Sequence, residues 1–330
     1  MTAGMTAKKR SRPASLSTIV RRAMAAAGEC ALPPGTPIVV AVSGGPDSMA
    51  LLDVLARLGP RLGLEVLAHG VDHGLRPEAA LELDLAEKFA TSVGVRFDRT
   101  RVTVPRGGNL QARARELRWS ALVSVARGRG AAIATAHHAD DRAETLLMRL
   151  LRGAGTRGLG VLPPRAEAPV TTPAPPAVPS PGVAVVRPLL RARRADILLH
   201  VERHAVPFAS DPSNEDPRYL RTSVRRAVLP LLEKLDPHIV RHLETVADEL
   251  VSAELRGKSQ AWASSLPRPT QEALTRLMAS GSHDARVWLP GGLVVSVDPR
   301  ARRRASVNAP TTIDGSNGAR ARVVPEKPSG

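Results

Sequence analysis

The stretch from Pro37 to Met49 constrains the fold more than any other part of the sequence. Residues 37–42 are apolar and mostly β-branched, with no charge, which is typical of a strand buried on both faces of a parallel sheet. From Met49 onward, apolar residues recur at helical spacing until Gly59-Pro60, which is a helix stop signal. The sequence therefore predicts a strand, a small polar loop and a helix that starts at the loop.

The loop reads Ser43-Gly44-Gly45-Pro46-Asp47-Ser48. A glycine pair at a strand–helix junction lets the backbone approach a ligand closely, and it directs N–H groups and the helix N-terminus at one point. Such a point binds an anion, although the glycine pair alone also suits an ordinary βα turn. The loop matches neither the G-x-x-x-x-G-K-[ST] of P-loop kinases nor the G-x-G-x-x-G of dinucleotide folds.

Strand and helix patterns alternate through the first two thirds of the chain. Strand patterns cover residues 64–69, 95–104, 131–135 and 183–186, and helix patterns cover residues 77–93, 109–127, 142–151 and 194–204. This alternation predicts an α/β fold with a doubly wound parallel sheet, whose ligands bind at the carboxyl ends of the strands. Polar residues that fall at those ends are Ser43, Asp72, His73, His137 and Asp140.

The acidic residues after His137-His138 have two interpretations. Asp140 and Glu144 are four residues apart and share one helix face. Two carboxylates beside a phosphate loop can hold a metal ion or a cationic substrate. Helix capping is the alternative for Asp140 and Asp141, because the helix dipole favours carboxylates at an N-terminus. His73, taken alone, is better explained as a loop residue than as a ligand.

Charge and cysteine content narrow the class of protein. The formal net charge is +16, from 47 Lys and Arg against 31 Asp and Glu, which favours a polyanionic partner, with nucleic acid first. Aromatic residues make up only 2%, so a stacked aromatic platform is not expected. Cys30 is the single cysteine, which excludes a disulfide framework and a cysteine-ligated cluster and fits a reducing cytoplasm. Because no apolar stretch could span a membrane, we expect a soluble cytoplasmic protein.

Several motifs resemble one known family. The hexad 43–48 resembles the SGGxDS loop of the N-type PP-loop ATP pyrophosphatases. VDHGLRPE at 71–78, ARELRW at 114–119 and HHADDRAETLLMRLLRGAG at 137–155 are similar to the tRNA(Ile)-lysidine synthetase branch of that group. The resemblance resumes at RPLL (187–190) and DPSNED (211–216). No larger carboxyl-terminal domain is evident, so the chain resembles the short form.

The resemblance implies a reaction and roles for particular residues. ATP adenylates the C2 oxygen of the wobble cytidine in the AUA-reading tRNA(Ile) with a CAU anticodon, and free L-lysine then displaces AMP to give lysidine. The loop Ser43, Gly44, Gly45, Pro46 and Ser48 would hold the departing pyrophosphate, and Asp47 would act through Mg²⁺. Arg115 would lie near the ATP phosphates and His137 beside the nucleotide. Substrate-binding candidates are Asp140 or Glu144 for the lysine ammonium, with Asp72, His73 and Arg118; Arg118 is equally explained as part of a solvated helix face.

The expected domains follow from pattern and resemblance together. They are a basic N-terminal extension with a helix (1–30), the catalytic domain (31–215) with a Pro-rich insertion (163–181), a helical tRNA-binding domain (216–298) that ends in one strand at 288–297, and a disordered tail (299–330). A basic helix face at Arg218, Arg221, Arg225 and Arg226 is expected to contact tRNA, with a solvated face as the alternative. The chain has Thr222 and Phe208 where the family usually has asparagine and tryptophan.

Other functions remain open at this point. The main alternative is another PP-loop enzyme, either a small-molecule amidotransferase or synthetase or a tRNA-thiolating enzyme. A single cysteine disfavours thiolation, and no glutaminase domain or amino-terminal catalytic cysteine supports an amidotransferase. A non-catalytic tRNA-binding relative is disfavoured by the intact loop with Asp47. A homodimer is left open.

Overall fold

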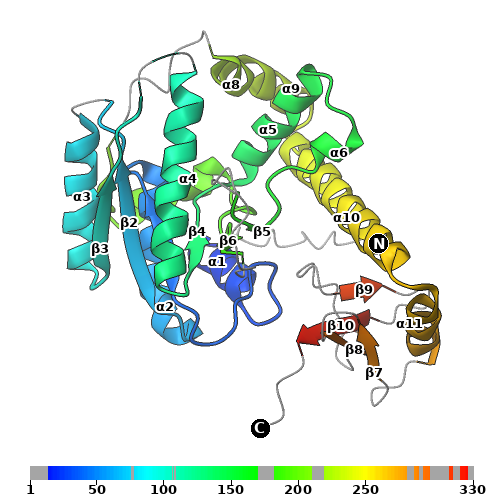
Figure 1. Ribbon diagram of the computed structural model, residues 1–330. Helices are drawn as coiled ribbons and strands as arrows, with labels where there is room; N and C mark the ends of the chain where they lie inside the picture. The colour runs from blue at the N-terminus through cyan, green and yellow to red at the C-terminus, as the bar shows by residue number, and fades with distance from the viewer. Residues whose placement is uncertain are drawn as a thin grey trace, which may run out of the picture.

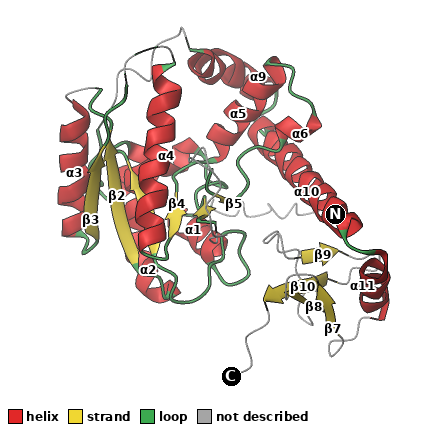
Figure 2. Ribbon diagram, in the orientation of Figure 1, coloured by secondary structure: helices red, strands yellow, loops and turns green. Residues whose placement is uncertain are grey.

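The computed structural model describes residues 14–75, 78–105, 107, 109–169, 182–209, 219–280, 286–289, 293–297, 312–314 and 320–325. Its central feature is a six-stranded sheet in the order β3-β2-β1-β4-β6-β5 (Figures 1 and 2). All neighbouring pairs are parallel except β5–β6, which is antiparallel. The strands are β1 (Ile38–Val42), β2 (Val66–Asp72), β3 (Arg96–Arg101), β4 (Ala132–Ala134), β5 (Arg165–Glu167) and β6 (Ala184–Val186).

Helices cover both faces of this sheet, as the alternating pattern predicts. Ile38, Val40 and Val42 of β1 face one core cluster with α1, α2, α3 and α7, whereas Val39 faces a second cluster with α4. A strand buried on both sides needs apolar residues at every position, which explains the uninterrupted run in β1. The helices are α1 (Leu16–Met24), α2 (Pro46–Leu62), α3 (Glu78–Ser92), α4 (Leu110–Gly128), α5 (Ala139–Leu151), α6 (Thr156–Leu159) and α7 (Arg194–Arg203).

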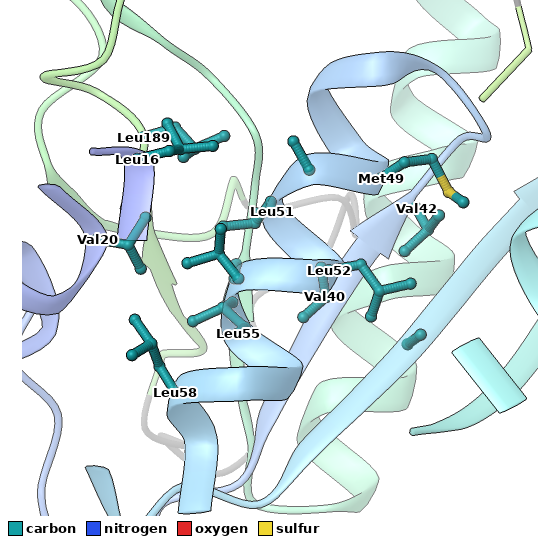
Figure 3. Close-up of a cluster of buried hydrophobic side chains, with 14 of the residues drawn as sticks. Leu16, Val20, Val40, Val42, Met49, Leu51, Leu52, Leu55, Leu58 and Leu189 are labelled. Atoms are coloured by element: carbon teal, nitrogen blue, oxygen red, sulfur yellow. The ribbon is translucent and has the colours of Figure 1, made fainter. Parts of the chain in front are cut away.

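The larger core cluster includes α1. Leu16 and Val20 of α1 are buried and pack in one cluster with Leu55 of α2 and Leu189 (Figure 3). Burying side chains of this size stabilises the fold by about 1.5–3 kcal/mol each. The structure therefore corrects the expected boundary at residue 30: α1 completes the core of the sheet domain and is not a separate extension.

Helix α2 begins at the loop, as expected, but ends later than the sequence predicts. It starts at Pro46, inside the loop, because proline suits the first turn, where its missing N–H has no intrahelical partner anyway. It continues through Pro60 to Leu62 and stops at Gly63, whose φ of +64° is a left-handed cap. The Leu64 N–H then donates to the Gly59 carbonyl at 2.9 Å. Gly59-Pro60 thus precedes the stop and does not form it.

The expected Pro-rich insertion contains a strand at its start. β5 pairs with β6 between Arg165 and Glu167, so residues 165–167 extend the sheet. The backbone hydrogen bonds to β6 explain why this part is ordered. Residues 170–181 lie outside the described residues, as do Arg218 and the motif at 211–216.

A helical region follows the sheet domain. It comprises α8 (Leu220–Ser223), the π-helix η2 (Val224–Val228), α9 (Leu229–Leu235), α10 (Ile239–Ser265) and α11 (Arg268–Ser280). In Figure 1, α10 runs from beside α5 away from the sheet. Val240 and Leu229 pack against Ala139 and Ala143 of α5. Among the described helices, none combines the length and the apolar character needed to cross a membrane.

The carboxyl-terminal part differs most from the expectation. Residues 288–297 do not form one strand: β7 (Arg286–Leu289) and β8 (Leu293–Val297) are antiparallel partners. β9 (Thr312–Asp314) and β10 (Arg320–Pro325) add to them, giving the order β7-β8-β10-β9. The expected disordered tail 299–330 therefore holds two strands. The local Gly, Ser and Pro content suggested disorder, whereas pairing of β10 with β8 supplies the backbone hydrogen bonds.

Candidate active site

Hydrogen bonds to the side chain of Ser48 hold the loop between β1 and α2 in shape. The Ser43 N–H donates to Ser48 Oγ at 3.1 Å, and the Ser48 hydroxyl donates to the Gly45 carbonyl at 3.0 Å. Gly44 has a φ of +81°, and a Cβ added there would lie 2.7 Å from the Glu82 carbonyl oxygen. The first turn of α2 presents N–H groups without intrahelical partners at this loop. The loop is therefore a preformed cradle for an anion.

Asp47 stands in the first turn of α2. Its Oδ1 is buried and has no hydrogen-bond partner among the described residues. Its Oδ2 lies 3.3 Å from Arg194 Nη1 and 3.8 Å from His138 Nε2. Burial raises the pKa of Asp47, although His138 and Arg194 oppose that rise. Asp47 Oδ1 can therefore bind a cation that enters the site together with a ligand.

His138 joins three carboxylates. It is fully buried as the N-cap of α5, and its backbone N–H donates to Asp141 Oδ2 at 3.2 Å. Its imidazole lies within 3.4 Å of Asp141, 3.5 Å of Asp140 and 3.8 Å of Asp47. Burial alone would lower the pKa of His138, but the carboxylates outweigh it and the pKa is raised. The Asp141 N–H donates to His138 Nδ1 at 3.4 Å, so the imidazole also caps the start of α5.

His137 behaves in the opposite way. Burial lowers its pKa to about 3; Asp141 opposes this shift, while the cationic Arg187, Arg115 and Arg221 add to it. A 2.9 Å hydrogen bond joins its Nδ1 to the Thr135 hydroxyl. His137 is therefore neutral near pH 7. The arginines that act on it would suit the phosphates of a nucleotide, and the neutral imidazole would suit contact with the nucleotide base.

Arg115 and Arg118 of α4 contribute to this cationic surface. Both residues are exposed. Partial desolvation lowers the pKa of each, and like charges add to the effect: Arg221 acts on Arg115, and Arg115 acts on Arg118. The guanidinium groups of Arg115 and Arg221 also lower the pKa of His137, so the three side chains interact electrostatically.

The expected lysine-binding carboxylates are already neutralised by arginines. Asp140 accepts hydrogen bonds from Arg193 Nη2 and from the Arg194 N–H, both at 2.8 Å. Burial would raise the pKa of Asp140, but its bonds with His138 and Arg193 hold it well below the usual range. Glu144, with a side chain 2% exposed, accepts from Arg225 Nε at 2.6 Å and from Arg221 Nε at 2.9 Å. A lysine ammonium at either carboxylate must exchange with a guanidinium.

The basic face expected to meet RNA is partly directed inward. Arg221 also donates to Asp141 Oδ1 at 2.6 Å, so Arg221 and Arg225 dock α8 and η2 onto α5. Arg226 is exposed. The alternative of a purely solvated face is wrong for Arg221 and Arg225, because burying Asp141 and Glu144 requires a cationic partner.

Asp72 is the last residue of β2, and His73 follows the strand. Asp72 Oδ1 accepts the Gly74 N–H at 2.8 Å, and Asp72 Oδ2 lies 3.9 Å from Arg101. Within the described part of the chain, no contact joins Asp72 to Asp47 or Asp140. Its observed role is to shape the turn, and its expected role in substrate binding stays a prediction.

Four site residues were not singled out from the sequence. They are His138, Arg187, Arg193 and Arg194, of which Arg187 donates to the Pro163 carbonyl at 2.6 Å. His138 has the same residue type as its neighbour His137, so sequence alone could not rank the two. The run Arg191-Ala192-Arg193-Arg194 after the RPLL motif was the available signal for the last two residues.

A cofactor can be assessed from these residues. No group of three or more His, Cys, Asp or Glu side chains among the described residues forms a complete metal site. The free Oδ1 of Asp47 beside the anion cradle fits Mg²⁺, which usually binds through one or two carboxylates, substrate phosphates and water.

Comparison with known proteins identifies the family. A family model for the PP-loop domain matches residues 16–232. A protein of Methylobacterium nodulans named tRNA(Ile)-lysidine synthase is 34% identical over 288 residues, which cover 87% of this chain and 78% of that protein. The chain belongs to the tRNA(Ile)-lysidine synthase family of PP-loop proteins. The family match includes α1, in agreement with its place in the core.

The chain spans about three fifths of the length of other curated relatives that it matches. The chain spans 60% of the relative from Novosphingobium aromaticivorans at 41% identity, and 58% of the relative from Pseudomonas aeruginosa at 36% identity. These alignments cover 61% and 76% of this chain. Among solved structures, the U34-tRNA thiolase NcsA from Methanococcus maripaludis aligns with a TM-score of 0.56 at 18% identity, over 72% of this chain and 78% of that one. This likeness supports the PP-loop fold.

Proposed function

We propose that the chain ligates lysine to C2 of the wobble cytidine of the AUA-reading tRNA(Ile), through an adenylated cytidine, to form lysidine. The observation that carries the proposal is the 34% identity across 87% of the chain to a tRNA(Ile)-lysidine synthase. The anion cradle beside a buried cluster of acidic residues and arginines supports it. The net charge of +16 suits an RNA substrate.

The first step uses the loop between β1 and α2. The C2 oxygen of cytidine attacks the α-phosphorus of ATP, the bond to the bridging oxygen of the β-phosphate breaks, and pyrophosphate leaves. The loop 43–48 receives this anion, and Arg115 offsets charge that develops on the phosphates. Mg²⁺, held through Asp47, supplies further charge neutralisation when bound. Neutral His137 lies beside the nucleotide.

The second step requires a place for lysine. Its amine attacks C2, the bond from C2 to the adenylated oxygen breaks, and AMP leaves with that oxygen while a proton is released. In this proposal the lysine ammonium is held at Asp140 or Glu144, where it replaces an arginine. The exchange keeps the local charge balanced, and the released guanidinium can turn to a phosphate of the RNA. Asp72, His73 and Arg118 are proposed to complete substrate binding.

Arginines of the helical region are proposed to hold the tRNA. Arg218, Arg221, Arg225 and Arg226 would neutralise backbone phosphates near the anticodon. We place the reaction in the cytoplasm, because its substrates are tRNA, ATP and free lysine. A homodimer is a further prediction, which sedimentation would test.

Thiolation is the less favoured function. Cys30 is buried, and burial raises its pKa to about 12. Its Sγ donates to the Pro164 carbonyl. A thiol held in the neutral form inside the core is a poor sulfur carrier, since the thiolate is the reactive species.

The proposal predicts that ATP cleavage depends on tRNA. With Mg-ATP and lysine, AMP and pyrophosphate should accumulate only when unmodified tRNA(Ile) is added. Asp140→Asn and Glu144→Gln should show which of the two carboxylates holds lysine. The variant of the residue that binds lysine should raise the KM for lysine about tenfold or more, with the KM for ATP little changed. AMP formation that needs no RNA would contradict the proposal.

A further inference from the structure

A cavity of about 400 Å³ lies where the start of α10 meets the segment after β6. Figure 1 shows α10 beginning near α5 and α9. The volume is in the range of nucleotide-sized ligand pockets. Its charged lining consists of Arg191, Arg193, His238, Arg241 and Glu244.

Two of the three arginines are fixed by acidic partners. Arg191 makes a bidentate pair with Glu29 at 2.8 and 3.0 Å, and its Nη1 lies 2.7 Å from Asp248 Oδ2. Arg193 is held by Asp140, with Glu233 as a second partner. Side chains held in this way present guanidinium groups to the cavity with little further loss of conformational freedom on binding.

The third arginine is uncommitted. Arg241 is exposed, and within the described residues no carboxylate or hydrogen-bond acceptor holds its guanidinium. Glu244 is the opposing charge in the lining, and Arg191 lies 3.6 Å from it. Because carboxylates already offset the charges of Arg191 and Arg193, the positive charge that the described residues leave without a partner in the lining is that of Arg241, and it favours an anionic ligand at this residue.

The position of the cavity indicates which anion it would take. Arg193 lines the cavity and also contacts Asp140, so the cavity adjoins the candidate active site. If a base of the RNA enters the active site, the RNA backbone on either side of that base passes the edge of the active site, where the cavity lies.

We propose that this cavity binds a backbone phosphate of the RNA substrate, with Arg241 as the main contact and Arg191 and Arg193 as fixed partners. The inference depends on the proposed function for one point, that the substrate is RNA. It assigns a phosphate site outside the loop 43–48 and outside the basic face at Arg221 and Arg225.

The test compares Arg241→Gln with Arg256→Gln, a change of an exposed arginine on the same helix outside the cavity. Binding of unmodified tRNA(Ile) to the full chain is measured by titration at several salt concentrations. Arg241→Gln should weaken binding roughly three- to tenfold and should lower the slope of log K against log salt by about 0.7–0.9, the change for one lost phosphate contact. Arg256→Gln should change neither by a comparable amount.

The possible outcomes separate this inference from the proposed function. If the wild type forms lysidine but Arg241→Gln binds tRNA with unchanged affinity and slope, the cavity assignment is wrong. If inorganic phosphate or pyrophosphate binds in an Arg241-dependent way while tRNA binding does not depend on Arg241, a free anion is the occupant and the assignment to RNA fails. If Arg241→Gln weakens RNA binding although no lysidine forms, the cavity assignment stands and the proposed reaction fails.

Discussion

His138 Nε2 lies 3.8 Å from Asp47 Oδ2 and so connects the loop after β1 with the acidic motif after β4. β1 and β4 are hydrogen-bonded neighbours in parallel orientation, which brings the N-termini of α2 and α5 together. Both helix starts favour carboxylates. The buried imidazole lies between the acidic groups of the two helices, so the anion cradle and the acidic residues at the start of α5 form one electrostatic unit.

Replacing His138 should alter how stability depends on pH. The pKa of His138 in the folded chain is raised: burial lowers it, but Asp140, Asp141 and Asp47 outweigh burial. Its charge therefore stabilises the fold fully below the unfolded pKa of about 6.5, and this contribution is lost as pH rises through the folded pKa. In urea unfolding between pH 6 and 9, the wild type should lose more stability with rising pH than His138→Gln. Parallel pH profiles would contradict this role.

Asp47→Asn should separate catalysis from folding. Because burial raises the pKa of Asp47, its ionised form is disfavoured in the folded chain, and an isosteric amide should leave the free energy of unfolding equal or higher at pH 7. ATP cleavage should fall by about 100-fold or more, since the free Oδ1 is lost as a cation ligand. Thermal unfolding and AMP release measure the two effects, and clear destabilisation would contradict the account of this carboxylate.

The two loop glycines should respond differently to alanine. Gly44 has a φ of +81°, and an added Cβ would meet the Glu82 backbone at 2.7 Å, so Gly44→Ala should destabilise the chain by more than about 1 kcal/mol. A Cβ at Gly45 would meet only Ser43 Oγ, at 3.7 Å, so Gly45→Ala should fold normally. Urea unfolding of both variants checks the difference. Equal stabilities would mean that the loop does not need the left-handed conformation at Gly44.

Arg142 should be essential for docking of α10. It is fully buried, donates to the Val161 carbonyl at 3.1 Å and pairs with Asp248 at 2.6 Å. Arg142→Met removes a hydrogen bond to a charged partner, which typically costs about 1.5–3 kcal/mol; Asp248 is partly exposed and keeps Arg191 at 2.7 Å, so its charge is not left unpaired. Arg152→Met, at an exposed position just after α5, should cost within about 0.5 kcal/mol. Chemical unfolding compares the pair, and similar losses in both variants would exclude a specific role for Arg142.

The sequence predicts local structure well and distant pairings poorly. The uninterrupted apolar run of β1 and the change of period at the loop correctly indicate a parallel sheet and the start of α2. The pairing of Arg193 with Asp140, 53 residues away, depends on how α7 packs and has no local signal. The inward direction of Arg221 and Arg225 likewise depends on the docking of α8 onto α5. The strands β9 and β10 form through pairing with β8, which composition does not reveal.

The most direct test of the proposed reaction is incorporation of labelled lysine into RNA. Unmodified tRNA(Ile) with a CAU anticodon is compared with tRNA(Met), which bears the same anticodon, in the presence of Mg-ATP and with Asp47→Asn as the control enzyme. We predict incorporation into tRNA(Ile) only, and none with the variant. ATP cleavage to AMP and pyrophosphate without lysine incorporation would contradict the assignment to lysidine formation while leaving the PP-loop chemistry intact.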